Sequence, residues 1–272
     1  MSKIRVGLVA QVLVPGDKNR NLQVMRHELD RYKDSNVDLF VFPESNISGG
    51  FWSGGDSDFI QLAESVPGGE SCHVVETMAR EFNTTICAGI VEGDDGEYFI
   101  THFVYGPEGY AGKQRKLFPG DPTRQKVFTS GKIVNILSVL GFRCAILACA
   151  DFLLPEPAIL AGLQECSLLL APTDCFTINH QELVTTLLRA RAIDTASSTV
   201  AVFGNGETFG GEVMAVAASD WKGQLLVLET TSSGQQTKTL VLELPIKEPG
   251  LQWGGTRLLL RRNESVDKGY HW

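Results

Sequence analysis

The chain has 272 residues, 43% of them hydrophobic and 21% charged, which is an ordinary composition for a globular protein. A formal net charge of −8 without a long basic run argues against nucleic-acid binding driven by phosphate neutralisation. No apolar stretch approaches the roughly 20 residues that span a bilayer, and no small-residue cleavage site follows the N-terminal apolar run. We therefore expect a cytoplasmic protein with neither a nucleic-acid nor a membrane partner.

In the first half of the chain, strands alternate with helices and tight turns. Apolar runs predict strands over 4–11, 37–44, 84–92 and 99–106, and the alternating segment 110–116 is a further predicted strand. Helices are predicted after the first strand, where Asp17 or Asn19 can cap an amphipathic segment, and over 62–82 with an interruption at 67–69. The last two strands flank Pro107-Glu108-Gly109, which predicts a hairpin turn.

The second half continues with near-continuous apolar strands, a pattern typical of strands that are buried on both faces. Strands are predicted over 142–150, 166–171 and 199–204, with helices over 156–165 and 180–196 and three further strands between 212 and 245. No linker, repeat or low-complexity segment interrupts this order. We expect one α/β domain over residues 1–272, whose last residues, about 263–272, form a tail.

The cysteines and histidines show no metal-binding or disulfide pattern. Six cysteines are scattered without a C-x-x-C pair, and five histidines lack metal-ligand spacing, so no metal or cofactor is expected. Cys72 and His73 are adjacent, but neighbours on a helix do not face each other, which disfavours a dyad. Cys144, Cys166 and Cys175 are expected to be packing residues.

Three segments end in a side chain that can carry chemistry. The strand 37–44 ends at Glu44, the segment 110–116 carries Lys116, and the strand 142–150 delivers Cys149. A nearby ammonium favours the nucleophilic thiolate, and a carboxylate can take the thiol proton and later activate water. Lys113 and Arg115, which flank Lys116 in the same segment, are expected to be surface charges.

These segments resemble the three signatures of the nitrilase superfamily, the carbon–nitrogen hydrolases. FPES at 42–45, RKLF at 115–118 and CADFLLPE at 149–156 have the order and spacing of that family. The stretches 11–22, 106–109 and 189–206 also resemble it, so the resemblance covers nearly the whole chain. It implies a four-layer α-β-β-α sandwich, no cofactor or metal, and homodimers or larger homo-oligomers.

The resemblance also assigns roles to the site residues. It implies that Glu44 is the general base, Lys116 stabilises the oxyanion, and Cys149 forms a thioester acyl-enzyme. The backbone N–H of Ala150 would be the second oxyanion donor. Asp151 is expected to position the turn by accepting backbone hydrogen bonds, because short acidic side chains commonly do so at turns.

Two positions depart from the family pattern. Ala150 stands where an aromatic residue usually follows the nucleophile. Arg124 stands four residues before a Phe-x-x-Gly pattern, where many members have a second glutamate. An arginine there could pair with Glu44 and lower its basicity, or bind a substrate carboxylate bidentately. Asp121 could stand in for the missing acid. The Gly-rich stretch 45–56 resembles a substrate loop, with Phe51 and Trp52 as candidate pocket walls.

The leading hypothesis is a hydrolase of a non-peptide C–N bond in a small linear amide or N-carbamoyl compound. A second hypothesis keeps the same thioester but transfers the acyl group to an amine instead of water. A third is a catalytically weak binding protein on the same fold, which the substitutions at Arg124 and Ala150 motivate.

Overall fold

The computed structural model describes residues 2–50, 60–120, 124–173, 181–206, 214–231 and 236–247. Phe51, Trp52, Asp121, Cys175 and the expected tail at 263–272 lie outside these ranges. Within them, no helix is long and apolar enough to cross a membrane. The elements form two six-stranded mixed sheets and a small two-stranded sheet.

The first sheet carries the N-terminal half of the chain and has the order β14-β1-β3-β4-β5-β6. Its strands are β1 (Ser2–Ala10), β3 (Leu39–Val41), β4 (Thr85–Asp94), β5 (Glu97–Gly106), β6 (Gly109–Arg115) and β14 (Lys238–Ile246). The strands β1, β3 and β4 run parallel, and β5 and β6 extend the sheet as an antiparallel hairpin.

The second sheet has the order β13-β12-β10-β9-β8-β7. Its strands are β7 (Leu137–Val139), β8 (Phe142–Ile146), β9 (Leu168–Thr173), β10 (Ser198–Phe203), β12 (Met214–Ser219) and β13 (Leu225–Thr231). Here β8, β9 and β10 run parallel. The short strands β2 (Val12–Leu13) and β11 (Asn205–Gly206) pair in parallel and so connect the two halves of the chain.

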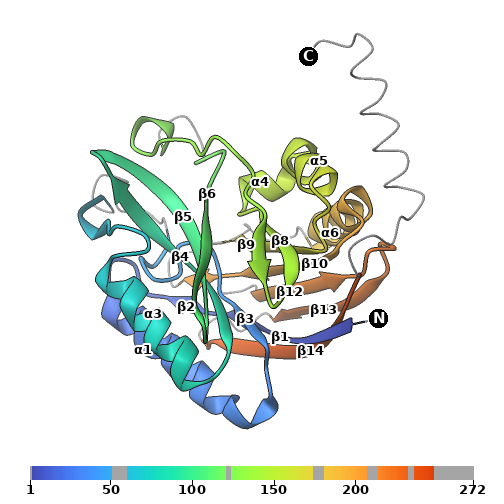
Figure 1. The fold of residues 1–272 in the computed structure, drawn as a ribbon, viewed down its shortest axis with the longest axis horizontal. Coiled ribbons are helices and arrows are strands. Elements are labelled where there is room, and N and C mark those ends of the chain that lie inside the picture. The colour runs from blue at the N-terminus through green and yellow to red at the C-terminus, as the bar shows by residue number, and fades with distance from the viewer. Residues whose placement is uncertain are drawn as a thin grey trace.

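Helices cover the outer face of each sheet, so the four layers are those of the expected α-β-β-α sandwich (Figure 1). The helices are α1 (Lys18–Arg31) and α3 (Glu70–Glu81) on the first sheet, and α5 (Pro155–Leu163) and α6 (Gln181–Thr195) on the second. Successive residues of a strand point to opposite faces of its sheet. Val6 and Leu8 of β1 therefore pack with Val200 and Val202 of β10 between the sheets, while Val9 packs against the helices.

Most predicted elements are confirmed, with corrections at their ends. Asp17, not Asn19, caps α1, since its side chain accepts a hydrogen bond from the Arg20 N–H. The helix predicted over 62–82 begins only at Glu70, because Pro67 disfavours a helical conformation in the residue before it. Strand β8 ends at Ile146, before the short helix α4 (Ala150–Leu153); neither β7 nor α4 was predicted.

Candidate active site

Glu44 lies in a turn that follows β3, and buried amide groups fix this turn. The Gly89 N–H of β4 donates to Asn46 Oδ1 at 2.8 Å, and Asn46 Nδ2 donates to Gln11 Oε1 at 3.0 Å. The Ile47 N–H donates to the Gly89 carbonyl at 3.0 Å. Because buried polar groups are costly unless hydrogen-bonded, this paired set holds one conformation of the turn.

Glu44 and Lys116 form a buried ion pair. Lys116 Nζ lies 2.6 Å from Glu44 Oε1, and both side chains are almost fully inaccessible to solvent. Oε2 of Glu44 has no hydrogen-bond partner among the described residues. Burial raises the pKa of Glu44, but the Lys116 ammonium, with smaller contributions from His102 and Arg124, outweighs burial and leaves the pKa below its usual range. Glu44 is therefore ionised at neutral pH and has one oxygen available for a proton.

The backbone of Lys116 is anchored just after β6. Its N–H donates to the Ile100 carbonyl of β5 at 2.8 Å, and its carbonyl accepts from the Gly131 N–H at 2.7 Å. Gly131 approaches so closely that a β-carbon there would lie 2.4 Å from the Arg115 carbonyl oxygen. Only glycine fits this contact. The backbone of Lys116 is thus held by Gly131 through its carbonyl and by strand β5 through its N–H.

Cys149 occupies a sharp turn between β8 and α4. Its φ of +46° and ψ of −106° are unusual for a residue with a side chain. Its N–H donates to the Pro172 carbonyl at 3.1 Å, and its carbonyl accepts from the Phe152 N–H at 3.0 Å. Backbone strain of this kind persists only where the surroundings impose it, and it commonly marks a functional position. The residue is only partly buried, in contrast to Cys144 and Cys166.

Asp151 joins the Cys149 turn to the Lys116 loop. Its two carboxylate oxygens accept hydrogen bonds from the Leu117 and Phe118 N–H groups, each at 2.8 Å. Burial raises the pKa of Asp151 to about 7, although these hydrogen bonds and the Lys116 charge lower it. The expected positioning role of Asp151 is confirmed. It holds together two loops that come from different sheets and carry the nucleophile candidate and the ammonium.

Arg191 of α6 holds the helix α4, which follows the Cys149 turn. It is 5% exposed, and its guanidinium donates to the Phe152 carbonyl at 3.0 Å and the Leu153 carbonyl at 2.7 Å. These carbonyls belong to the last residues of α4, where helix carbonyls lack intrahelical partners. The guanidinium also reaches Asp194 at 3.0 Å. A buried arginine therefore fixes the helix that begins directly after Cys149.

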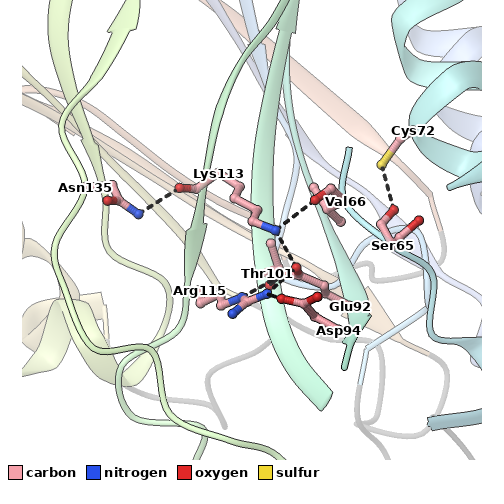
Figure 2. A network of polar contacts seen from close by, with 9 residues as sticks. All are labelled: Ser65, Val66, Cys72, Glu92, Asp94, Thr101, Lys113, Arg115 and Asn135. Atoms are coloured by element: carbon pink, nitrogen blue, oxygen red, sulfur yellow. Dashed lines mark hydrogen bonds and ion pairs between the residues drawn. The ribbon is translucent and has the colours of Figure 1, made fainter. Parts of the chain in front are cut away.

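The opposite face of the β5–β6 hairpin carries a separate charge network (Figure 2). Glu92 accepts from Lys113 at 2.5 Å, from Thr101 at 2.6 Å and, through both oxygens, from Arg115 at 3.0 and 2.6 Å. Arg115 also reaches Asp94 at 2.5 Å and lies 3.7 Å above the Phe99 ring. The expectation that Lys113 and Arg115 are surface charges is wrong: both are about three-quarters buried, because they pair with a buried acid.

A pocket of about 430 Å³ opens beside this network at the edge of β6. Charged side chains of both signs, including Glu97 and Lys132, line it. Arg115 and Lys113 already have carboxylate partners there. Within the described ranges, no group of three or more His, Cys, Asp or Glu side chains is arranged to hold a metal ion.

Of the remaining candidate residues, Arg124 acts on the site and the Cys72–His73 pair does not form one. Arg124 begins a short 3₁₀ turn (Arg124–Lys126), and its charge contributes to the lowered pKa of Glu44. The Cys72–His73 pair is not a dyad: Cys72 Sγ is directed to the Ser65 carbonyl at 3.9 Å (Figure 2), while His73 is exposed beside Glu76. Burial raises the pKa of Cys72 to about 12, so its thiol stays protonated.

Sequence reasoning missed His102, which is buried and whose pKa responds to both Glu44 and Lys116. A signal for it existed. His102 pairs with Gln114 across the hairpin, and Lys116 follows two residues later. Strand alternation therefore places His102 on the face from which Lys116 projects.

Comparison with known proteins agrees with this geometry. The model of the carbon-nitrogen hydrolase family matches residues 5–229, and the chain therefore belongs to that family. An aliphatic nitrilase of Sinorhizobium fredii is 27% identical over 135 residues, 44% of this chain and 43% of the nitrilase. A Schizosaccharomyces pombe hydrolase is 28% identical, over 70% of this chain and 61% of its own length. An omega-amidase of Xenopus laevis is 28% identical over 71% of this chain and 72% of its own length.

Solved structures share the fold over almost the whole chain. An amidase from Nesterenkonia AN1 superposes with a TM-score of 0.79 at 19% identity, covering 97% of this chain and 96% of the amidase. A carbon–nitrogen hydrolase superfamily protein from Xanthomonas campestris superposes with a TM-score of 0.76 at 18% identity, covering 100% and 99%. At these identities the similarity establishes the fold, and the first two curated relatives are matched over less than two thirds of their length.

Proposed function

We propose that this protein hydrolyses a non-peptide C–N bond in a small linear amide or N-carbamoyl compound through a thioester on Cys149. The observation that supports it most is the buried Glu44–Lys116 ion pair, which Asp151 ties to the Cys149 turn. An amide is favoured over a nitrile as substrate because the omega-amidase matches 71% of this chain and 72% of its own length, against 44% and 43% for the aliphatic nitrilase. The family match over residues 5–229 supports a single catalytic domain in most of the chain.

The proposed reaction has two half-steps. Glu44 takes the thiol proton of Cys149 while the sulfur attacks the carbonyl carbon, and Lys116 and the Ala150 N–H stabilise the oxyanion. The Ala150 N–H is the first of α4, a position without an intrahelical acceptor. The C–N bond then breaks, and Glu44 returns the proton to the leaving amine. Water that Glu44 deprotonates cleaves the thioester, releasing the acid and the thiol.

Replacing Cys149 tests this mechanism. Cys149→Ala should abolish ammonia release from a panel of amides, N-carbamoyl compounds and nitriles at pH 7–8, while Cys144→Ala, five residues earlier on β8, should retain it. Intact-mass analysis of the unaltered enzyme during turnover should show an acyl adduct on Cys149. Turnover that survives Cys149→Ala would exclude the mechanism.

Arg124 is proposed as a substrate-binding residue. Its charge lowers the pKa of Glu44, so the guanidinium lies within electrostatic range of the candidate base, and a guanidinium can bind a substrate carboxylate through two hydrogen bonds. Arg124→Gln should raise KM about tenfold or more for a dicarboxylic acid monoamide, since hydrogen bonds between charged groups are worth about 1.5–3 kcal/mol. KM for a neutral amide of equal length should not change. Equal effects on both substrates would instead indicate that Arg124 acts on Glu44.

The other proposals concern the surroundings of the site. Phe51 and Trp52 remain candidate pocket walls. A homodimer or larger homo-oligomer is supported by exposed apolar side chains on the adjoining helices α5 and α6: Leu160 at 48%, Leu183 at 44% and Ile193 at 53%. Light scattering of Ile193→Asp should then report a smaller particle. A cytoplasmic location is supported by the five described cysteines, none of which is in a disulfide.

Acyl transfer is the second candidate, because the same thioester can react with an amine. Adding hydroxylamine to the assay distinguishes the two reactions. A transferase should form hydroxamate in preference to acid, and a hydrolase should continue to release mainly acid. A weak binding protein would turn over no substrate, and its Cys149 would react with iodoacetamide no faster than an ordinary thiol.

A further inference from the structure

His102 is a buried histidine, and one nitrogen of its imidazole has no partner in the described part of the chain. It lies in the middle of β5, between Gly89 of β4 and Gln114 of β6, and is 1% exposed. Its Nε2 has no hydrogen-bond partner among the described residues. A buried polar atom without a partner is rare in a folded protein and requires an explanation.

The imidazole lies against the turn that carries Glu44. A β-carbon on Gly89 would be 2.7 Å from His102 Nε2 and 2.6 Å from the Ser45 backbone nitrogen. His102 Nε2 and the Ser45 nitrogen therefore both border the position that a side chain at residue 89 would occupy, and only glycine fits there. Ser45 directly follows Glu44, and its hydroxyl also lacks a partner among the described residues, as does Oε2 of Glu44. Within the described residues, three side chains near this turn thus have a polar atom without a partner, and Glu44 and His102 are close enough to affect each other's pKa.

Burial keeps the His102 imidazole neutral at neutral pH. Burial lowers the pKa of His102 to about 4; Glu44 raises this pKa and Lys116 lowers it. The other neighbours in the sheet add no charge, since Gly89 has no side chain and the Gln114 amide is bonded to the Arg115 and Ile133 carbonyls and the Asn135 N–H. A neutral imidazole has one N–H donor, and a carboxylate oxygen without a partner is an acceptor.

We propose that His102 is a positioning residue for Glu44. Its imidazole N–H hydrogen-bonds, directly or through one water molecule, to the carboxylate oxygen that Lys116 does not hold. Lys116 and His102 together then fix both oxygens of Glu44 and stabilise its ionised form. This inference rests on the proposed role of Glu44 as the base for Cys149.

The reaction of Cys149 with iodoacetamide tests the inference without a known substrate. Its rate is followed by intact mass from pH 4.5 to 9 in the unaltered protein and in His102→Ala, His102→Gln and the exposed-site control His73→Ala. His102→Ala should shift the acid limb of the rate upward by about one pH unit, because the ionised carboxylate loses a donor. His102→Gln keeps a donor and should recover most of the shift, and His73→Ala should match the unaltered protein.

The same measurement in a Glu44→Gln background separates the two ideas. If His102 acts through Glu44, His102→Ala should cause no further change there. An unchanged rate in Glu44→Gln alone would reject Glu44 as the base, and with it the proposed function. A lowered rate in Glu44→Gln beside an unshifted limb in His102→Ala would reject only the role of His102.

Imidazole ¹⁵N spectra of the unaltered protein provide a test that does not require a His102 variant to fold. One of the five histidines should stay neutral from pH 8 to 5, and its signal should move in Glu44→Gln. Five histidines that all titrate near pH 6.5, or a neutral histidine that is insensitive to Glu44→Gln, would overturn the inference.

Discussion

The two faces of the β5–β6 hairpin each present a buried glutamate to basic residues, and the two glutamates are treated differently. On the outer face, Glu92 receives hydrogen bonds from Thr101, Lys113 and both ends of the Arg115 guanidinium. On the inner face, Glu44 has one ammonium contact and an oxygen without a partner in the described part of the chain. A carboxylate whose oxygens all have hydrogen-bond partners stabilises a fold. A carboxylate with one oxygen left without a partner can still accept a proton from a substrate or a thiol.

The largest expected effect comes from exchanging the two glutamates for glutamine. Glu44→Gln should lower amide turnover by about 10²- to 10⁴-fold, the usual contribution of a general base, because an amide cannot take the Cys149 proton. Glu92→Gln should leave turnover within about tenfold and lower the free energy of unfolding by about 3 kcal/mol, because two basic side chains lose a buried counter-charge. Ammonia release and urea unfolding measure both quantities. If the two variants are equally stable and Glu92→Gln lowers turnover more than Glu44→Gln does, the proposed difference between the two glutamates is wrong.

The two lysines of the hairpin should differ in the same way. Lys116→Met should reduce turnover by about 10²- to 10³-fold, since an oxyanion donor is lost and Glu44 is left buried without its counter-charge. Lys113→Met leaves Glu92 paired with Arg115 and Thr101, so turnover should persist and stability should fall by about 1 kcal/mol. Similar turnover in the two variants would remove the distinction between the faces.

The pH dependence of stability should also differ between the faces. Burial raises the pKa of Asp151 to about 7, so its stabilising contribution is complete below about pH 4 and is lost as pH rises to 7. The excess stability of the unaltered protein over Asp151→Asn should therefore decline between pH 5 and 7, by about 1 kcal/mol per pH unit. Urea unfolding at pH 5, 6, 7 and 8 measures this difference.

Glu92 provides the matched control for that experiment. Burial raises the pKa of Glu92, but hydrogen bonds from Arg115, Lys113 and Thr101 outweigh burial and hold it below its usual range. Its stabilising contribution is present above the ordinary pKa of a glutamate and is lost only as pH falls through the lowered value. The stability difference between the unaltered protein and Glu92→Gln should thus stay constant from pH 5 to 8. A constant difference for Asp151→Asn as well would contradict the raised pKa.

The sequence was sufficient to locate Glu44, Lys116 and Cys149 as candidates, because each lies at the end of a predicted strand and in a short motif with local spacing. The ion pair between the first two and the bridge through Asp151 depend on how segments that are distant in the sequence are brought together by the order of the strands in two sheets. His102 was missed for a related reason. Its place beside the Glu44 turn follows from cross-strand register and from the empty position at Gly89, and neither leaves a motif in the chain.

The charge of Lys113 and Arg115 led to a wrong prediction of their exposure, because tertiary packing determines how buried these side chains are. Lys113, Arg115 and Lys116 are consecutive or nearly so, and the sequence distinguishes them only by strand parity. Parity assigns Lys113 and Arg115 to one face but does not say what covers that face. Glu92 of the neighbouring strand β4 is their partner, and pairing with it leaves both side chains only about one quarter exposed.

The smallest expected effect tests how fully the outer network is satisfied. Thr101 Oγ1 donates to Glu92 Oε2 at 2.6 Å, and Thr101→Val removes that donor while keeping the shape of the side chain. Because Arg115 also holds Oε2, the oxygen does not become unpaired, and stability should fall by only about 1 kcal/mol. The acid limb of Cys149 alkylation should stay in place, unlike the limb in His102→Ala, although Thr101 and His102 are adjacent in β5. A shifted limb in Thr101→Val would mean that the two faces of the hairpin communicate and that the separation drawn between Glu92 and Glu44 is wrong.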